Sequence, residues 1–268
     1  MPAGRLRLCL VGTGVIAAEV RRQLAASSDV HVAAVVRSPR SQEGRAAAPG
    51  SGDALAVDAV PDTGIDLVVE MASDAAVTQH VVPALERGIP CLVCSVGALA
   101  TPGVLASVQA AARKGHTYTQ LITGAIGAID ALAAAALGGL SEVRYTGRKP
   151  PRAWEGTAAA SQHSLEQLQE ATVVFAGPAR TAALRFPKNA NVAATVAMAG
   201  IGLDQTHVTL LADPAVDCNV HHVVASGAFG RLEFSTYNAA FADNPRSSML
   251  VAWSVTRAIL NHASPIRF

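Results

Sequence analysis

Near its start the chain reads Leu8-Cys9-Leu10-Val11-Gly12-Thr13-Gly14-Val15-Ile16-Ala17, and this stretch decides the fold. An apolar run ends in two glycines spaced one residue apart, and a small residue follows three positions later, which is the pattern of a dinucleotide-binding turn. Gly12 permits a tight turn, Gly14 lets a pyrophosphate approach the backbone, and Ala17 lets the helix pack closely on the strand. Val15 and Ile16 open that helix, whose free N–H groups suit phosphates. We therefore expect Gly12, Gly14, Val15 and Ile16 to bind a dinucleotide.

The pattern alone also fits a structural glycine turn, so its context matters. Here it joins an expected strand at residues 5–11 to an expected helix at 15–26. Strands and helices then alternate: strands at 30–36, 66–70, 90–93 and 117–121, and helices at 75–87 and 102–114. Such alternation predicts an α/β fold, a doubly wound parallel sheet of the Rossmann type, over residues 1–122.

The character of the sequence changes near Thr123. We expect a Gly- and Ala-rich helix at 124–137, helical segments at 164–169 and 192–201, and strands at 142–146, 207–211, 219–224 and 231–237. This order predicts an α+β domain over residues 123–244 with an open, mainly antiparallel sheet. The Asn244-Pro245 pair is a helix-start signal, so we expect a final helix at 245–262 that packs back onto the first domain.

Composition excludes several classes of protein. The formal net charge of +1 gives no sign of a nucleic-acid or membrane-surface partner. No apolar run approaches the roughly 18–20 residues of a membrane span, and the chain shows no signal-peptide pattern, so we expect a cytoplasmic protein. Cys91 and Cys94 have metal-site spacing, but alternation along a strand would put their thiols on opposite faces. We therefore expect buried thiols and no metal site.

The end of the second expected strand bears on the choice of cofactor. Enzymes selective for NAD place an acidic residue there to bind the ribose 2′-hydroxyl. This chain instead has Arg37 and, three residues later, Arg40, whose guanidinium groups suit a 2′-phosphate. We expect NADP to bind, alone or alongside NAD; the alternative is a solvated basic loop. Glu70 closes a later strand and either lines the ligand crevice or caps the next segment. The segment Ser95-Val-Gly97-Ala98 follows the next strand, and its position makes it a candidate lining of the nicotinamide site.

Five further strings in the chain have a distinctive pattern. They are Thr123-Gly-Ala-Ile-Gly-Ala-Ile-Asp130, Arg144-Tyr-Thr-Gly-Arg-Lys-Pro-Pro151, Phe186-Pro-Lys-Asn-Ala-Asn-Val-Ala-Ala194, Asn219-Val-His221 and Asp243-Asn-Pro245. Together with the opening glycine turn they resemble one family, the L-aspartate dehydrogenases. The resemblance runs over nearly the whole chain, and its most specific parts are the Tyr-Thr-Gly-Arg-Lys-Pro-Pro and Phe-Pro-Lys-Asn-Ala-Asn-Val strings.

The resemblance implies oxidation of L-aspartate to iminoaspartate with NAD(P), followed by hydrolysis to oxaloacetate and ammonia, or the reverse reductive amination. It also implies that His221 is the acid/base and that Ala125 and Asn191 contact the cofactor. The family often has an acidic residue after that histidine, whereas this chain has His222, so the partner that orients His221 stays open. Alternation along a strand puts His221 and His222 on opposite faces.

Binding of the two substrate carboxylates calls for cations or amides. Lys188 is the first candidate, with Arg148 or Lys149 second, against the alternative that each is a solvated surface charge. Two other readings remain: a related two-domain reductase, such as a homoserine dehydrogenase or a dihydrodipicolinate reductase, or a non-catalytic NAD(P)-binding sensor. We expect a homodimer, because exposed antiparallel sheets often pair.

Overall fold

The computed structural model describes residues 4–37, 54–187, 189–241 and 244–267. The chain forms two compact units. The first comprises Met1–Ala98, Gly103–Ile122 and Ala252–Phe268, and the second Leu99–Pro102 and Thr123–Val251. Within the described ranges, no helix combines the length and the apolar character that a membrane crossing requires.

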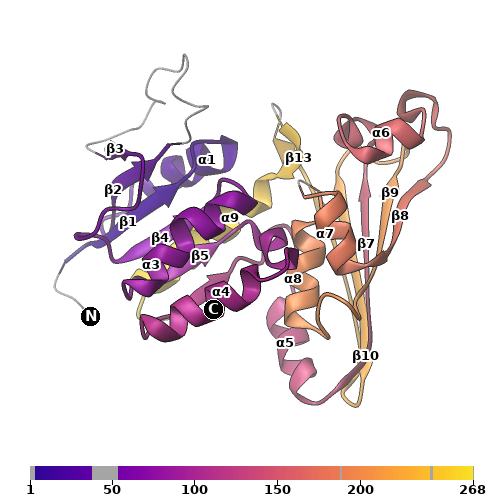
Figure 1. Ribbon diagram of the computed structural model, residues 1–268. Coiled ribbons are helices and arrows are strands. Elements are labelled where there is room, and N and C mark those ends of the chain that lie inside the picture. Colours follow the sequence, from indigo (N-terminus) through magenta and orange to yellow (C-terminus); the bar gives the residue numbers. More distant parts are fainter. Residues whose placement is uncertain (1–3, 38–53, 188, 242–243, 268) are drawn as a thin grey trace. The chain divides into compact units, whose positions relative to one another are not determined.

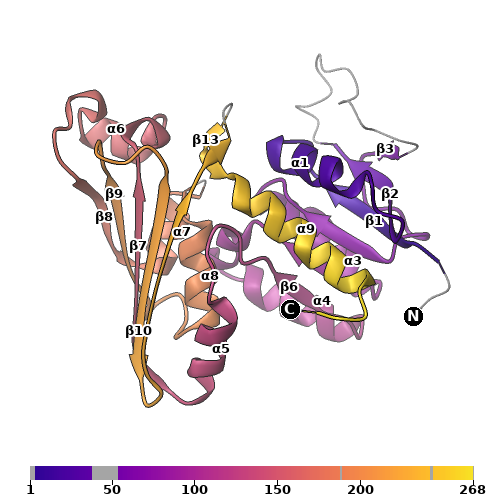
Figure 2. The same ribbon diagram turned by 180° about the vertical axis from the view of Figure 1, so that it is seen from behind.

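The first unit is built on a six-stranded sheet in the order β3-β2-β1-β4-β5-β6, and every pairing in it is parallel. Figures 1 and 2 show helices on both faces, α1 and α9 on one and α3 and α4 on the other. The doubly wound fold predicted from the sequence is confirmed. Its elements are β1 (Leu6–Val11), α1 (Val15–Leu24), β2 (Val30–Val36), β3 (Leu55–Val57), β4 (Leu67–Glu70), α2 (Asp74–Ala76), the π-helical turn Val77–Val81, α3 (Val82–Glu86), β5 (Cys91–Val93), α4 (Val104–Lys114), β6 (Thr119–Leu121) and α9 (Met249–Ala263).

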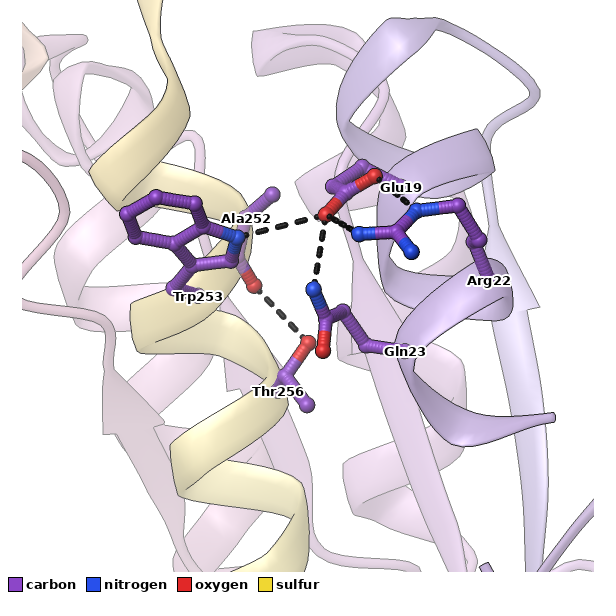
Figure 3. A network of polar contacts seen from close by, with 6 residues as sticks. All are labelled: Glu19, Arg22, Gln23, Ala252, Trp253 and Thr256. Carbon is purple, nitrogen blue, oxygen red and sulfur yellow. Dashed lines mark hydrogen bonds and ion pairs between the residues drawn. The ribbon is translucent and has the colours of Figure 1, made fainter. Parts of the chain in front are cut away.

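The helix α9 is tied to α1 by a polar network (Figure 3). The Glu19 carboxylate accepts hydrogen bonds from Arg22, from Gln23 and, at 3.2 Å, from the indole N–H of Trp253. The hydrogen bonds from Arg22 and Gln23 are the main cause that lowers the pKa of Glu19 to about 2. Helix α9 is thereby held against the helix that follows the glycine turn.

The start of the last helix differs from the prediction. Residues Asn244–Ser248 form a strand, β13, that pairs with β12 (Ala240–Phe241), and α9 begins only at Met249. The Asn-Pro pair is a local helix-start signal, and the strand pairing with β12 overrides it.

The second unit is built on a five-stranded sheet in the order β11-β10-β7-β9-β8. All neighbours are antiparallel except β7 and β9, so the predicted mainly antiparallel sheet is confirmed. Three helices, α5, α7 and α8, lie on one face of it (Figure 1), which we call the inner face. The elements are α5 (Ile129–Leu137), β7 (Leu140–Lys149), the 3₁₀ turns Pro151–Trp154 and Leu165–Gln167, α6 (Ala158–Gln162), β8 (Thr172–Pro178), α7 (Ala179–Arg185), α8 (Asn191–Ala199), β9 (His207–Ala212), β10 (Asn219–Gly227) and β11 (Gly230–Asn238).

Two features of this unit differ from the sequence expectations. Helix α5 begins at Ile129 and not at residue 124, because Gly124 (φ 71°) and Ala128 (φ 57°) both take left-handed conformations that a right-handed helix cannot include. The strand β8 and the helices α6 and α7 were not predicted. A β-branched run at the start of β8 and Pro178 immediately before α7 are the sequence signals that indicate β8 and α7.

Candidate active site

The glycine turn has the geometry that a dinucleotide requires. Gly12 has φ +118°, and a Cβ there would lie 2.9 Å from the carbonyl oxygen of Met71, so only glycine fits. Gly14 is exposed, and a Cβ there would meet no atom within 4 Å, so the space above it is open. Helix α1 begins directly after it, at Val15 and Ile16. Its first N–H groups lack intrahelical acceptors and suit a pyrophosphate, so these residues fit the cofactor.

Glu70 lies at the carboxyl end of β4, fully buried, and connects two loops at that edge of the sheet. One carboxylate oxygen, Oε1, accepts from the backbone N–H groups of Ala72 (2.7 Å) and Ser73 (3.0 Å) and from the hydroxyl of Ser95 (2.9 Å). The other, Oε2, accepts from the N–H of Ser95 at 2.9 Å. Burial raises the pKa of Glu70 against these four donors. Of the two roles left open by the sequence, these contacts are those of a cap.

The strand end expected to bind the ribose lies at Val36, and Arg37 follows it. Its backbone N–H donates to the carbonyl of Val57 at 3.1 Å, and its side chain is partly exposed. Arg40 lies outside the described residues.

His221 and His222 point to opposite faces of the second sheet, as alternation predicts. The side chain of His221 is buried on the inner face, only 2% exposed. His222 lies on the outer face, where its Nε2 is 3.0 Å from a carboxylate oxygen of Glu233 on β11. His222 is therefore oriented by a neighbour of its own and takes no part in the setting of His221.

Tyr145 is the partner of His221 that the sequence left open. Its hydroxyl oxygen lies 2.7 Å from Nδ1 of His221, and both side chains are buried. In the pairing of β10 with β7, His221 lies opposite Gly147, two residues along the strand from Tyr145. A Cβ on Gly147 would lie 2.7 Å from that hydroxyl oxygen. The missing side chain of Gly147 thus provides the space in which tyrosine and histidine meet.

The other ring nitrogen of His221, Nε2, is buried and has no hydrogen-bond partner among the described residues. Burial is the main cause that lowers the pKa of His221, and the positive charge of Lys149 adds to it; together they bring it to about 3. Lys149 lies on the same face of β7, only 4% exposed. The imidazole is therefore neutral near pH 7, and Nε2 is the atom with free capacity for a ligand.

Ala125 is connected to the strand position opposite His221 through the side chain of Thr236. Its carbonyl oxygen accepts from the hydroxyl of Thr236 at 2.9 Å and from the side-chain amide of Asn238 at 2.8 Å. Thr236 lies directly opposite His221 in the pairing of β10 with β11. The structure thus brings together two residues that the sequence singled out separately.

The side chains predicted to bind the substrate carboxylates do not all lie near His221. Arg148 occupies the opposite face of β7 from Tyr145 and Lys149, and its guanidinium forms an ion pair with buried Asp213 at 2.7 Å. Arg148 is therefore not among the side chains around His221; its neighbour Lys149 is. Lys188 lies outside the described residues. Asn191 is the half-buried first residue of α8.

Sequence reasoning missed Tyr145, Thr236 and Asn238 as members of the site. The usable signal was period-2 alternation, which puts Tyr145, Gly147 and Lys149 on one face of a strand. In the described part of the chain, no three His, Cys, Asp or Glu side chains are grouped to hold a metal ion. Burial raises the pKa of the Cys9 and Cys91 thiols to about 12.

Two family models match separate parts of the chain. A family model described as aspartate dehydrogenase, C-terminal, matches residues 130–262, and a model of the NAD binding domain of homoserine dehydrogenase matches residues 12–121. The archaeal homoserine dehydrogenase solved with NADPH has a TM-score of 0.58 at 12% identity, covering 97% of each chain, which is a likeness of fold alone.

Aspartate dehydrogenases are similar over the whole length. The crystal structure of the enzyme from Thermotoga maritima superposes with a TM-score of 0.77 at 26% identity, covering 98% of this chain and 99% of the other. The L-aspartate dehydrogenase of Ralstonia pickettii is 50% identical over 97% of this chain and 99% of its own length. That of Cupriavidus necator is 51% identical with the same coverage. The chain therefore belongs to the L-aspartate dehydrogenase family.

Proposed function

We propose that the protein is an L-aspartate dehydrogenase. It oxidises L-aspartate to iminoaspartate, which hydrolyses to oxaloacetate and ammonia, and it catalyses the reverse reductive amination. The observation that carries the proposal is the buried, neutral His221, whose Nδ1 is held by Tyr145 while Nε2 has no protein partner among the described residues. A sensor that only binds a nucleotide has no use for such a group.

A nicotinamide dinucleotide, when bound, supplies the acceptor or donor of the hydride. Gly12, Gly14, Val15 and Ile16 would hold its pyrophosphate, and Ala125 and Asn191 are proposed as further contacts. The two hydrogen bonds that Thr236 and Asn238 donate to the carbonyl of Ala125 fix the backbone there in place. The protein contributes position and electrostatics, since the redox chemistry belongs to the cofactor.

His221 is proposed as the group that exchanges a proton with the substrate at Nε2. The substrate amine must lose a proton before its Cα can give up a hydride, and a neutral imidazole can accept one. Burial keeps the ring neutral near pH 7. Lys188, the first candidate from the sequence, and Lys149, which lies on the same face as His221, are proposed to attract the substrate carboxylates.

The test is to mix the protein with oxaloacetate, ammonia and NADPH and to follow the loss of the reduced-nicotinamide absorbance. Activity with these three reactants, and none when ammonia is left out, is the expected result. His221→Ala is expected to lower kcat by about 10²–10⁴-fold, the usual contribution of a general acid or base. His222→Ala, on the outer face, is the matched control. A normal kcat for His221→Ala would refute the assignment.

Cofactor preference is tested at Arg37. If its guanidinium binds the 2′-phosphate, Arg37→Ala should weaken NADPH about 10- to 100-fold, the value of a hydrogen bond to a charged group. The affinity for NADH should stay the same, because NADH lacks that phosphate. Fluorescence titration with both nucleotides measures the ratio, and an unchanged ratio would exclude Arg37 from this role.

The outer face of the second sheet also suggests how the protein assembles. The outer face of the second sheet carries His222 and the 73% exposed Tyr237. We propose that this face pairs with a second copy in a cytoplasmic homodimer. Light scattering coupled to size exclusion measures the mass, and Tyr237→Glu should then give a monomer.

A further inference from the structure

The hydrogen bond between Tyr145 and His221 bears on which ring nitrogen of His221 carries the proton, and its importance rests on the proposed function of His221. A neutral imidazole has one N–H and one lone pair, so one of its two nitrogens donates and the other accepts. Because burial keeps the ring neutral, the position of that single proton decides what Nε2 offers a substrate.

The surroundings of Tyr145 decide which atom donates in this pair. Tyr145 is 1% exposed, and Nδ1 of His221 is the one hydrogen-bond partner found for its hydroxyl among the described residues. If Nδ1 carried the proton and donated to Tyr145, the hydroxyl hydrogen would be buried without an acceptor, and a buried unsatisfied donor is costly. The hydroxyl therefore donates to Nδ1. Burial also raises the pKa of Tyr145, so the hydroxyl keeps its proton.

We propose that Tyr145 is a positioning residue whose hydroxyl donates to Nδ1 of His221 and so holds the ring proton on Nε2 in the resting protein. In this state Nε2–H is available to the substrate as a hydrogen-bond donor, suited to polarise the carbonyl oxygen of an oxo acid for the attack of ammonia, which releases water and gives the imine that is then reduced. For Nε2 to accept a proton from an amine, the ring must first exchange with water, releasing the proton from Nε2 and taking one up at Nδ1, and the hydroxyl then turns to accept from Nδ1–H. A tyrosine hydroxyl can do both, which a carboxylate cannot.

The space for this arrangement depends on Gly147. A Cβ there would lie 2.7 Å from the hydroxyl oxygen of Tyr145, 3.2 Å from Cε1 of its ring and 3.1 Å from Cδ2 of Leu210. Gly147→Ala therefore moves the hydroxyl away from Nδ1 while the tyrosine itself remains. The two variants Tyr145→Phe and Gly147→Ala remove one hydrogen bond by independent routes.

The direct test is ¹⁵N NMR of protein labelled at histidine, with the signals of His221 assigned by their loss in His221→Gln. The expected wild-type spectrum has a protonated Nε2 and an unprotonated, hydrogen-bonded Nδ1. Tyr145→Phe and Gly147→Ala are expected to give a mixture of tautomers. A wild-type spectrum with the proton on Nδ1, or a Tyr145→Phe spectrum unchanged from wild type, would overturn the assignment.

The kinetic test separates positioning from folding. Tyr145→Phe should lower kcat about 10- to 100-fold, the value of one hydrogen bond to a group that becomes charged, and leave KM for oxaloacetate nearly unchanged. The double variant with Gly147→Ala should lose no more than either single variant, because both remove the same contact. An unchanged kcat, or losses that add, would overturn the positioning role.

Matched controls exist in the chain. Tyr118 and His262 form a second tyrosine–histidine pair, with 3.2 Å between hydroxyl and Nδ1, but Tyr118 is 50% exposed. Tyr118→Phe should leave kcat and the His221 signals as in wild type. Gly138→Ala, where a Cβ would make an ordinary 3.6 Å contact, is the control for Gly147→Ala. The NMR spectra need neither substrate nor cofactor, so a failure of the proposed reaction leaves the tautomer result standing.

Discussion

Replacing Glu70 by glutamine tests whether one buried carboxylate joins the loops that follow β4 and β5. The carboxylate accepts four hydrogen bonds, one of them at Oε2 from the N–H of Ser95. Glutamine keeps a single carbonyl oxygen, which can take over the three bonds at Oε1. Its amide nitrogen, which is a donor, then takes the place of Oε2, so the N–H of Ser95 loses its acceptor.

The expected cost follows from that unpaired N–H. A buried donor without an acceptor costs about 1–3 kcal/mol. The three hydrogen bonds at Oε1 also become weaker, because the glutamine oxygen carries no charge. The neutral side chain, however, no longer has the desolvation cost of a buried charge, which offsets part of that weakening. We therefore expect Glu70→Gln to lower the free energy of unfolding by about 1–3 kcal/mol and Tm by about 3–10 °C.

Thermal and urea unfolding followed by circular dichroism measure this change. Glu86→Gln is the control, since Glu86 forms an exposed ion pair with Lys114 at 3.2 Å and should matter by no more than about 1 kcal/mol. Ser95→Ala removes only the hydroxyl donor, and should cost less than Glu70→Gln. A Glu70→Gln protein as stable as wild type would refute the view that this carboxylate joins the two loops.

Three further outcomes are expected. In the unfolded chain, the histidine at position 221 takes up a proton below about pH 6.5. In the folded protein, His221 stays neutral down to about pH 3. Between these two pH values the free energy of unfolding should therefore fall by about 1.4 kcal/mol for each unit by which the pH is lowered. His221→Gln should lack this one-proton slope in urea unfolding at pH 6, 5 and 4, and equal slopes would contradict the burial argument. Gly12→Ala forces a Cβ against the carbonyl of Met71, and should abolish NADPH binding in calorimetry while costing about 1–3 kcal/mol of stability. Arg148→Ala leaves the carboxylate of Asp213 buried without its cation, so it should lower Tm but not raise KM for aspartate; a large rise in KM would return Arg148 to the substrate site.

The sequence was most informative where one local pattern satisfies one physical requirement. The turn at Gly12 is such a case, because a left-handed φ and the close approach of Met71 leave room for glycine alone. Alternation likewise separated His221 from His222 and placed them on opposite faces. These predictions depend on neighbouring residues of one segment.

The sequence was less informative where another segment decides the outcome. Asn244 and Pro245 form a good helix start, yet β12 pairs with Asn244 and Ser248, and the segment forms a strand. Tyr145 is 76 positions from His221 in the sequence, and only the register of β7 on β10 reveals them as partners. Arg148 and Lys149 are adjacent cations, and the choice between them depended on which face of β7 each occupies.

The grouping of α9 with the first unit bears on the order in which the protein is made. Residues Ala252–Phe268 belong to that unit, although the whole of Thr123–Val251 lies between them and its sheet. A ribosome therefore completes the second unit before Trp253 exists to donate to Glu19. During that interval one face of the nascent parallel sheet lacks α9. Truncated nascent chains that end before Ala252 should therefore be cut by proteases within the first unit, while the second unit resists cleavage.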